Sequence, residues 1–212
     1  MISIALTGGV ATGKSTAAAL MRKHWGDSAA FFSADSAVHE LLTKGAIKTR
    51  ITAVFGEGVL DADGEIDRGK LRRIAFCNGP LRRKLEGILH PEVQSMGLEA
   101  RCVAIENQKE RLVYEIPLLY EIDSQMERNF DVVVAASEKT QRMRMAEIRG
   151  LEPETIEQLI TAQIPITQKM IRADFVIWND AGEAELEEQI FLLLDFLNST
   201  SFEDEKHLPP HT

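Results

Sequence analysis

GGVATGKS, residues 8–15, is a glycine-rich segment that ends in a lysine and a serine. It matches G-x-x-x-x-G-K-[ST], the phosphate-binding pattern called the P-loop. A short apolar run at residues 2–6 precedes it and predicts a buried strand, and the Ala-rich segment 16–25 that follows predicts a helix. A P-loop needs this setting between a strand and a helix. The competing dinucleotide pattern G-x-G-x-x-G does not occur in this stretch.

The positions of this loop have separate chemical tasks. Gly8 and Gly13 can take backbone angles that a β-carbon forbids, so that successive N–H groups turn inward toward phosphate. We expect Lys14 to reach the β and γ phosphates of a nucleotide, and Ser15 to place its hydroxyl on Mg²⁺. The predicted nucleotide-binding residues are Gly8, Gly9, Val10, Ala11, Thr12, Gly13, Lys14, Ser15 and Thr16.

Composition narrows the class of protein. A chain of 212 residues is long enough for one well-packed domain, and its net charge of -9 argues against general nucleic-acid binding. No run of 18 apolar residues predicts a membrane span, and the N-terminus lacks the basic region of a signal peptide. Cys77 and Cys102 have no cysteine partners at metal-ligand spacing, so we expect both to be small core residues in a reducing cytoplasm.

Strand and helix patterns alternate along the chain, which predicts an α/β doubly wound parallel sheet of about five strands. Further strands are expected at residues 29–32, 112–114, 132–135 and 175–177. Residues 67–107 contain no strand pattern and predict an all-helical insertion. Within it, His90-Pro91 is expected to join a helix that ends at Leu89 to one that runs from Pro91 to Asn107.

Two carboxylates are expected at the carboxyl edge of the sheet, where ligands bind in open α/β folds. Asp35 follows the second strand, and its position fits equally a base near the γ-phosphate and an N-cap of the next helix. Glu115 ends the third strand and could assist Mg²⁺ through water, or serve only as an edge carboxylate near Lys14.

Basic residues gather in two helical stretches. In each stretch they could bind phosphate groups or simply lie on a solvated surface. Seven of them fall within residues 68–84, where they predict either contact with an anionic substrate or a solvated helix face. Arg142, Arg144 and Arg149 follow the fourth strand, where they could clamp a transferring phosphoryl group from a mobile lid or lie on the surface. His90 reads as a turn residue or a catalyst.

Taken in order, several segments resemble the dephospho-CoA kinase family. The resemblance runs from about Ile2 to Leu197 and is carried by segments in a specific sequence. They are residues 5–16, Ala34-Asp35, Arg68 with Leu71 and Phe76, Leu85-Glu86 with His90-Pro91, Pro117-Leu118-Leu119, Gln141 with Arg144, Gln163, and residues 173–179 ending at Asn179.

The resemblance implies ATP-dependent phosphorylation of the ribose 3′-hydroxyl of dephospho-CoA, which gives coenzyme A and ADP. It implies a P-loop kinase core over residues 1–198, with a CoA-binding insertion at about 67–107, a small lid at about 138–165 and a polar, disordered tail at 199–212. By the same resemblance, Asp35 accepts the proton of the acceptor hydroxyl, Arg144 is the lid arginine and Asn179 lies near the adenine. Asp35, Arg68, His90, Pro117 and Leu118 are then the substrate-binding residues, and Asp35, Lys14 and Arg144 the catalytic ones.

The chain departs from the family pattern at several positions. Ser33 stands where an aspartate is frequent, Glu115 where Asp is usual, and Tyr120 where Phe is usual. A second lid arginine often stands at the position of Ile148, whereas here Arg149 follows one residue later. A nucleoside or nucleotide kinase with the same core is the alternative enzyme, and a GTPase switch is disfavoured because no Asn-Lys-x-Asp segment occurs. The expected partners are ATP and dephospho-CoA, with Mg²⁺, in a cytoplasmic monomer or weak homo-oligomer.

Overall fold

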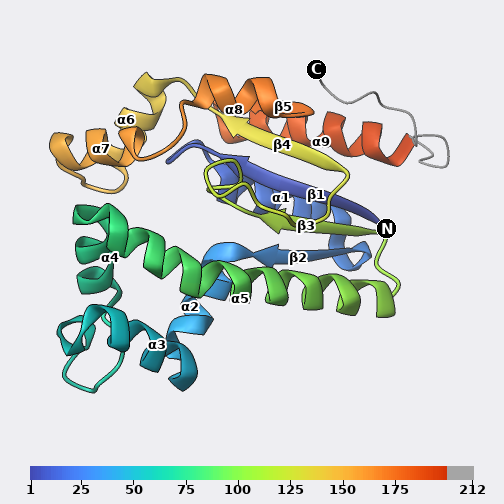
Figure 1. Ribbon diagram of the computed structural model, residues 1–212. Helices are drawn as coiled ribbons and strands as arrows, with labels where there is room; N and C mark the ends of the chain where they lie inside the picture. Colours follow the sequence, from blue (N-terminus) through green and yellow to red (C-terminus); the bar gives the residue numbers. More distant parts are fainter. Residues whose placement is uncertain (200–212) are drawn as a thin grey trace. The chain divides into compact units, whose positions relative to one another are not determined.

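The computed structural model describes residues 1–199, with only the backbone described at residues 76 and 77. Five strands form one sheet in the order β2-β3-β1-β4-β5 (Figure 1). The strands are β1 (Ile2–Gly8), β2 (Ala29–Ser33), β3 (Arg111–Glu115), β4 (Phe130–Ala135) and β5 (Phe175–Trp178). The α-helices are α1 (Lys14–Trp25), α2 (Ala34–Thr43), α3 (Gly45–Phe55), α4 (Arg68–Cys77), α5 (Gly79–Glu106), α6 (Glu138–Glu147), α7 (Pro153–Thr161), α8 (Ile166–Arg172) and α9 (Glu183–Ser199). The predicted α/β class and its five strands are confirmed.

The chain folds into two compact units. The first comprises Met1–Thr7 and Asp27–Asp131, and the second comprises Gly8–Gly26 and the described chain from Val132 to Ser199. The predicted borders of the insertion (67–107) and the lid (138–165) stay predictions. The predicted tail lies, from residue 200 on, outside the described residues, as do the side chains of Phe76 and Cys77.

The first unit is built on the parallel pairs β1–β3 and β2–β3. Register places Leu6 and Ser33 beside Glu115, so the three strands end at one edge. Ile4, Leu112 and Val113 are fully buried, which explains the apolar runs in these strands. The long helix α5 packs against β2 and β3 and runs along β2 in Figure 1. Helices α2, α3 and α4 also pack against α5.

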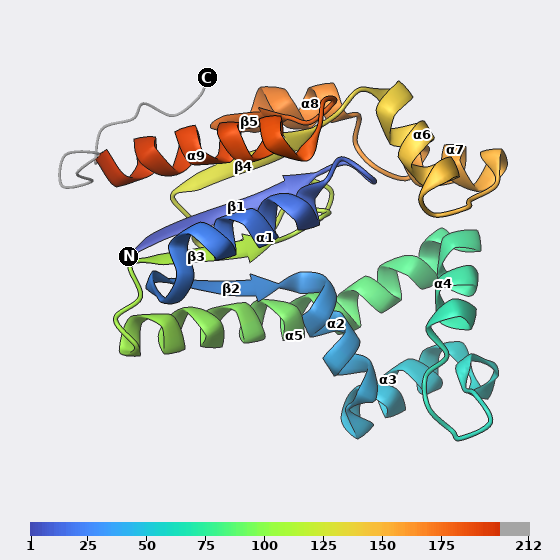
Figure 2. The same ribbon diagram turned by 180° about the vertical axis from the view of Figure 1, so that it is seen from behind.

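The second unit is built on the parallel pair β4–β5, which runs in register from Val132 beside Phe175 to Ala135 beside Trp178. Helix α9 packs against β5 and against α1, as Figure 2 shows. The apolar side of α9 supplies buried Leu186, Ile190 and Leu194. Helices α6 and α7 pack against each other.

Helix α5 corrects the prediction that His90-Pro91 joins two helices. It runs unbroken for 28 residues with Pro91 inside it. A proline in a helix interior lacks the N–H for one backbone hydrogen bond and crowds the preceding turn. Leu89 and Val93 are both buried on either side of it, and burial of this apolar face stabilises the helix through the proline. His90 is therefore a helical residue and not a turn residue.

The N-terminus of α2 and the exposure of Cys102 correct two further predictions. The N-cap of α2 is Ser33, whose side-chain oxygen accepts a hydrogen bond from the Ser36 N–H at 3.3 Å, while Asp35 lies within the first turn. Asp35 as N-cap is therefore wrong. Asp67 caps α4 in the same way, by accepting from the Lys70 N–H at 3.0 Å. Cys102 is exposed on α5, so its assignment to the core is wrong.

Within residues 1–199, no helix is both long enough and apolar enough to cross a membrane.

Candidate active site

The loop after β1 has the backbone of an anion-binding nest. Ala11 and Gly13 are both left-handed, with φ of 57° and 94°. Gly13 is also the N-cap of α1, and no side chain there bonds to the first N–H groups of the helix. Backbone N–H groups in a left-handed turn and at an open helix N-terminus bind anions well. A β-carbon on Gly13 would clash with Nδ2 of Asn179, so this position requires glycine.

Side chains from distant parts of the second unit hold this loop. Gln163 Oε1 accepts from the Val10 N–H at 3.0 Å, and Asn179 Nδ2 donates to the Thr12 carbonyl at 2.8 Å. Lys169 Nζ donates to the Gly8 carbonyl at 3.3 Å, although its side chain is 0% exposed. Burial of a charged group costs free energy unless the group is hydrogen-bonded. The bond to the Gly8 carbonyl therefore indicates that Lys169 stabilises the loop. Sequence analysis missed Lys169, because only its burial distinguishes it from a surface lysine.

Arg144 lies against the same loop. Its guanidinium donates to the carbonyls of Ala11 and Thr12 at 3.5 and 3.4 Å, and to Asn179 Oδ1 at 3.4 Å. The structure therefore brings Arg144 and Asn179 together with the predicted nucleotide-binding loop. Gln141, which is 4% exposed, supports them by donating to the Ala136 carbonyl at 3.0 Å.

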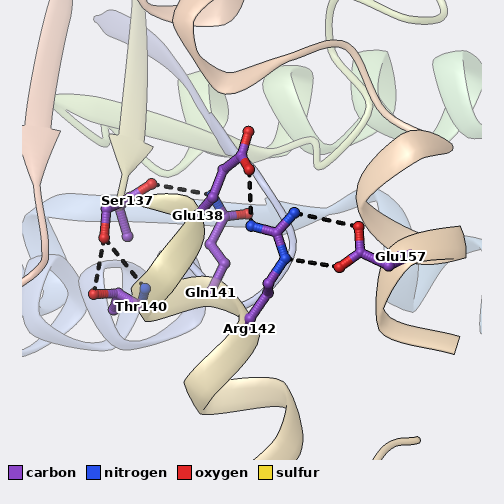
Figure 3. Close-up of polar contacts among 7 residues, drawn as sticks. Ser137, Glu138, Thr140, Gln141, Arg142 and Glu157 are labelled. Carbon is purple, nitrogen blue, oxygen red and sulfur yellow. Dashed lines mark hydrogen bonds and ion pairs between the residues drawn. The ribbon is translucent and has the colours of Figure 1, made fainter. Parts of the chain in front are cut away.

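Arg142 has a different environment from Arg144, two residues away. Figure 3 shows its guanidinium between Glu138 and Glu157, at 2.8 and 2.7 Å. The hydrogen bonds raise the pKa of Arg142 above its usual value, chiefly through Glu157, and the same bond lowers the pKa of Glu157. Arg142 thus joins α6 to α7 on the surface. Of its two predicted roles, this is the surface position and not the clamp on a phosphoryl group. Arg149 lies beyond the end of α6 and is exposed.

The sheet edge of the first unit carries Asp35 and Glu115. Asp35 is exposed in the first turn of α2, and Glu115 is half-buried at the end of β3. The chain after Glu115 is fixed because the Ile116 N–H donates to the Leu6 carbonyl at 3.0 Å and Thr7 Oγ1 donates to the Pro117 carbonyl at 3.2 Å. These bonds hold the segment Pro117-Leu118 beside the end of β1.

A pocket of about 310 Å³ opens in the first unit among α2, α4 and α5. Three predicted substrate-binding residues line it, namely Arg68, His90 and Leu118. Its walls include Leu71 and Leu89. An open hollow of about 530 Å³ on α2 is lined by Asp35 and His39 among others. Pro117, the remaining predicted residue, lines neither cavity.

No cluster of three or more His, Cys, Asp or Glu side chains suited to a metal occurs in the described part of the chain. Of the predicted Mg²⁺ residues, Ser15 is exposed at the start of α1 in the second unit, and Glu115 is half-buried at the end of β3 in the first. A Mg²⁺ ion that is bound mostly by nucleotide phosphates and waters needs few protein ligands, and a serine hydroxyl and a carboxylate are oxygen donors that suit it.

The sequence model of one family, described as dephospho-CoA kinase, matches residues 2–185. The chain belongs to the dephospho-CoA kinase family. A dephospho-CoA kinase of Geobacillus kaustophilus is 36% identical over 194 residues, which cover 91% of this chain and 95% of that protein.

Solved structures share the fold of this family member. A crystal structure of a Thermus thermophilus protein has a TM-score of 0.79 at 29% identity, and covers 94% of this chain and 98% of that one. A dephospho-CoA kinase from Campylobacter jejuni has a TM-score of 0.59 at 24% identity, with 92% and 96% covered. The P-loop kinase fold expected from the resemblance is therefore confirmed.

Proposed function

We propose that this protein transfers the γ-phosphoryl group of ATP to the ribose 3′-hydroxyl of dephospho-CoA, giving coenzyme A and ADP. The observation that carries the proposal is the left-handed loop at Ala11 and Gly13, with Arg144 and Asn179 hydrogen-bonded to its carbonyls. The loop supplies a phosphate site, and membership of the family supplies the acceptor.

On the donor side, the loop amides bind the phosphates and Lys14 adds a point charge at the β and γ positions. Phosphoryl transfer depends mainly on positioning and on neutralising the charge of the transferring group. Arg144 is already held at the loop through two carbonyls, so little ordering of its side chain is needed when negative charge develops. Ser15 is the residue that would hold Mg²⁺ by its hydroxyl, with Glu115 as a further candidate, and a bound ion would supply positive charge that neutralises the phosphates.

On the acceptor side, the pocket in the first unit combines apolar walls with basic groups. Dephospho-CoA has the same mixture, because a largely uncharged pantetheine arm is joined to an anionic diphosphate. Leu71 and Leu89 suit the arm, and Arg68 suits a phosphate, since its planar guanidinium can bind two oxygens at once. Asp35, which is exposed at the carboxyl edge of the strands, would accept the proton of the 3′-hydroxyl.

The test is a coupled assay of ADP release with dephospho-CoA, AMP or thymidine as acceptor. Of the three acceptors, we expect only dephospho-CoA to raise ADP release well above the rate seen with ATP and no acceptor. Faster release with AMP or thymidine would replace the proposal by nucleotide or nucleoside kinase activity. Isothermal titration with the three acceptors gives their affinities independently of turnover.

The pair Arg144 and Arg142 gives a matched comparison on one helix. Arg144→Ala should lower kcat by well over tenfold with a smaller change in the ATP dissociation constant, because its partner charge develops in the transition state. Arg142→Ala removes the same side chain from an exposed ion pair and should change kcat by less than about twofold. Steady-state kinetics with dephospho-CoA measure both. If the two substitutions changed kcat equally, Arg144 would be a surface residue like Arg142, with no specific role in the transition state.

We propose a cytoplasmic location and a monomer or weak homo-oligomer. An exposed free thiol at Cys102 supports a reducing compartment, because such thiols oxidise readily elsewhere. Analytical ultracentrifugation across a range of concentrations tests the state of assembly.

A further inference from the structure

His39 and Arg68 form a contact that the reaction described above does not use. His39 lies on α2 and Arg68 begins α4, and Arg68 Nη1 lies 2.6 Å from His39 Nδ1. A guanidinium can only donate, so Nδ1 must be the acceptor. The imidazole is therefore neutral at this contact, and its proton is on Nε2.

The type of partner decides what Arg68 can do. Arg82, in the same pocket, donates to the carboxylate of Glu86 at 2.8 Å, so that its charge is largely neutralised. Within residues 1–199, Arg68 has an imidazole and no carboxylate as its partner. A neutral acceptor fixes the direction of a guanidinium but leaves its positive charge available to an anion.

The position of the contact relates it to the acceptor. Arg68 lines the pocket of about 310 Å³, while His39 lines the neighbouring hollow on α2 together with Asp35. Asp35 and His39 are four residues apart on one helix, so they share a face. The Arg68–His39 bond therefore joins Arg68, the proposed anion-binding residue, to helix α2. The same helix carries Asp35, the proposed base.

We propose that His39 is a positioning residue that holds the Arg68 guanidinium toward an anionic phosphate of the acceptor without neutralising it. The inference rests on the proposed function, because it names how one site residue meets dephospho-CoA. The diphosphate is the anionic group of that molecule, and its paired oxygens match the planar fork of arginine. His39 itself need not touch the acceptor.

The experiment uses two substitutions of nearly equal size. His39→Leu removes the acceptor, whereas His39→Asn puts an amide oxygen near the place of Nδ1. We expect His39→Leu to raise KM for dephospho-CoA roughly tenfold, in keeping with loss of a hydrogen bond to a charged group. Its kcat and its KM for ATP should stay within about twofold of wild type. His39→Asn should restore most of the KM.

A second cycle tests that His39 acts through Arg68. In an Arg68→Ala background, His39→Leu should cause little further rise in KM, because the group it orients has gone. His24→Leu is the matched control: His24 is a helical histidine in the second unit, 3.2 Å from Glu187, and its loss should leave both KM values unchanged. Long-range ¹H–¹⁵N NMR of the imidazole should show the Nε2–H tautomer of His39, and Arg68→Ala should change that spectrum.

Several outcomes overturn the inference. They are an unchanged KM in His39→Leu, equal damage by His39→Asn, or additive effects in the Arg68→Ala background. Failure of the proposed function looks different, because the wild-type protein itself would then show no dephospho-CoA-dependent release of ADP.

Discussion

Lys14→Ala is expected to lower kcat by roughly a thousandfold. Lys14 is the first residue of α1, directly after left-handed Gly13, so its side chain starts at the loop where we propose that the phosphates bind. Removing one group that stabilises transition-state charge typically costs two to three orders of magnitude in rate. Steady-state and single-turnover measurements of ADP formation give the size of the loss.

The fold should tolerate this substitution, because Lys14 is only half-buried and alanine is a good helix former. Lys23→Ala is the matched control on the same helix: Lys23 pairs with Glu187 at 2.9 Å on the surface, and its loss should leave turnover unchanged. Turnover near the wild-type level in a folded Lys14→Ala protein would show that the loop does not bind the transferring phosphate.

Asp35→Asn is expected to lower kcat by roughly two to four orders of magnitude, which is the usual contribution of a general base. A ribose hydroxyl is a poor nucleophile at neutral pH, and the amide cannot accept its proton. Folding should be little affected, because Ser33 and not Asp35 caps α2. ATP affinity should also be nearly intact, because the loop amides and Lys14 are the groups proposed to bind ATP.

Thermal unfolding, ATP affinity and phosphorylation of dephospho-CoA should be measured on one preparation of Asp35→Asn. Glu65→Gln, an exposed carboxylate of the same unit that pairs with Lys48 at 2.7 Å, controls for loss of charge and should keep full activity. Full activity of a normally folded Asp35→Asn protein would remove Asp35 from the catalytic residues.

Much of the fold and of the nucleotide site could be predicted from the sequence. The central strands could be found because parallel strands buried on both faces read as continuous apolar runs, as in β4 with its fully buried Val132, Val133 and Val134. The loop could be found from its spacing of glycines, lysine and serine, and its left-handed backbone requires glycine at Gly13. Arg144 and Asn179 came from the family resemblance, and the structure places both at that loop.

The remainder depended on tertiary contacts that no local pattern records. Pro91 reads as a helix boundary, yet burial of Leu89 and Val93 holds α5 together through it. Ser33 and Asp35 are both good capping residues, and only the backbone decides between them. Lys169 and the His39–Arg68 pair are separated in sequence from the groups they contact, by 161 and 29 positions. The roles of these residues follow from their burial and from the groups that they contact, and both are known only from the folded chain.

We propose that the 3′-hydroxyl of dephospho-CoA receives the γ-phosphoryl group of ATP. The most direct measurement is ³¹P NMR and mass spectrometry of the products formed by the wild-type protein with ATP, Mg²⁺ and dephospho-CoA. We expect coenzyme A and ADP in equal amounts, with the new phosphorus signal that of a 3′-phosphomonoester. Release of ADP without coenzyme A, or a phosphate on any other position of the acceptor, would contradict the claim.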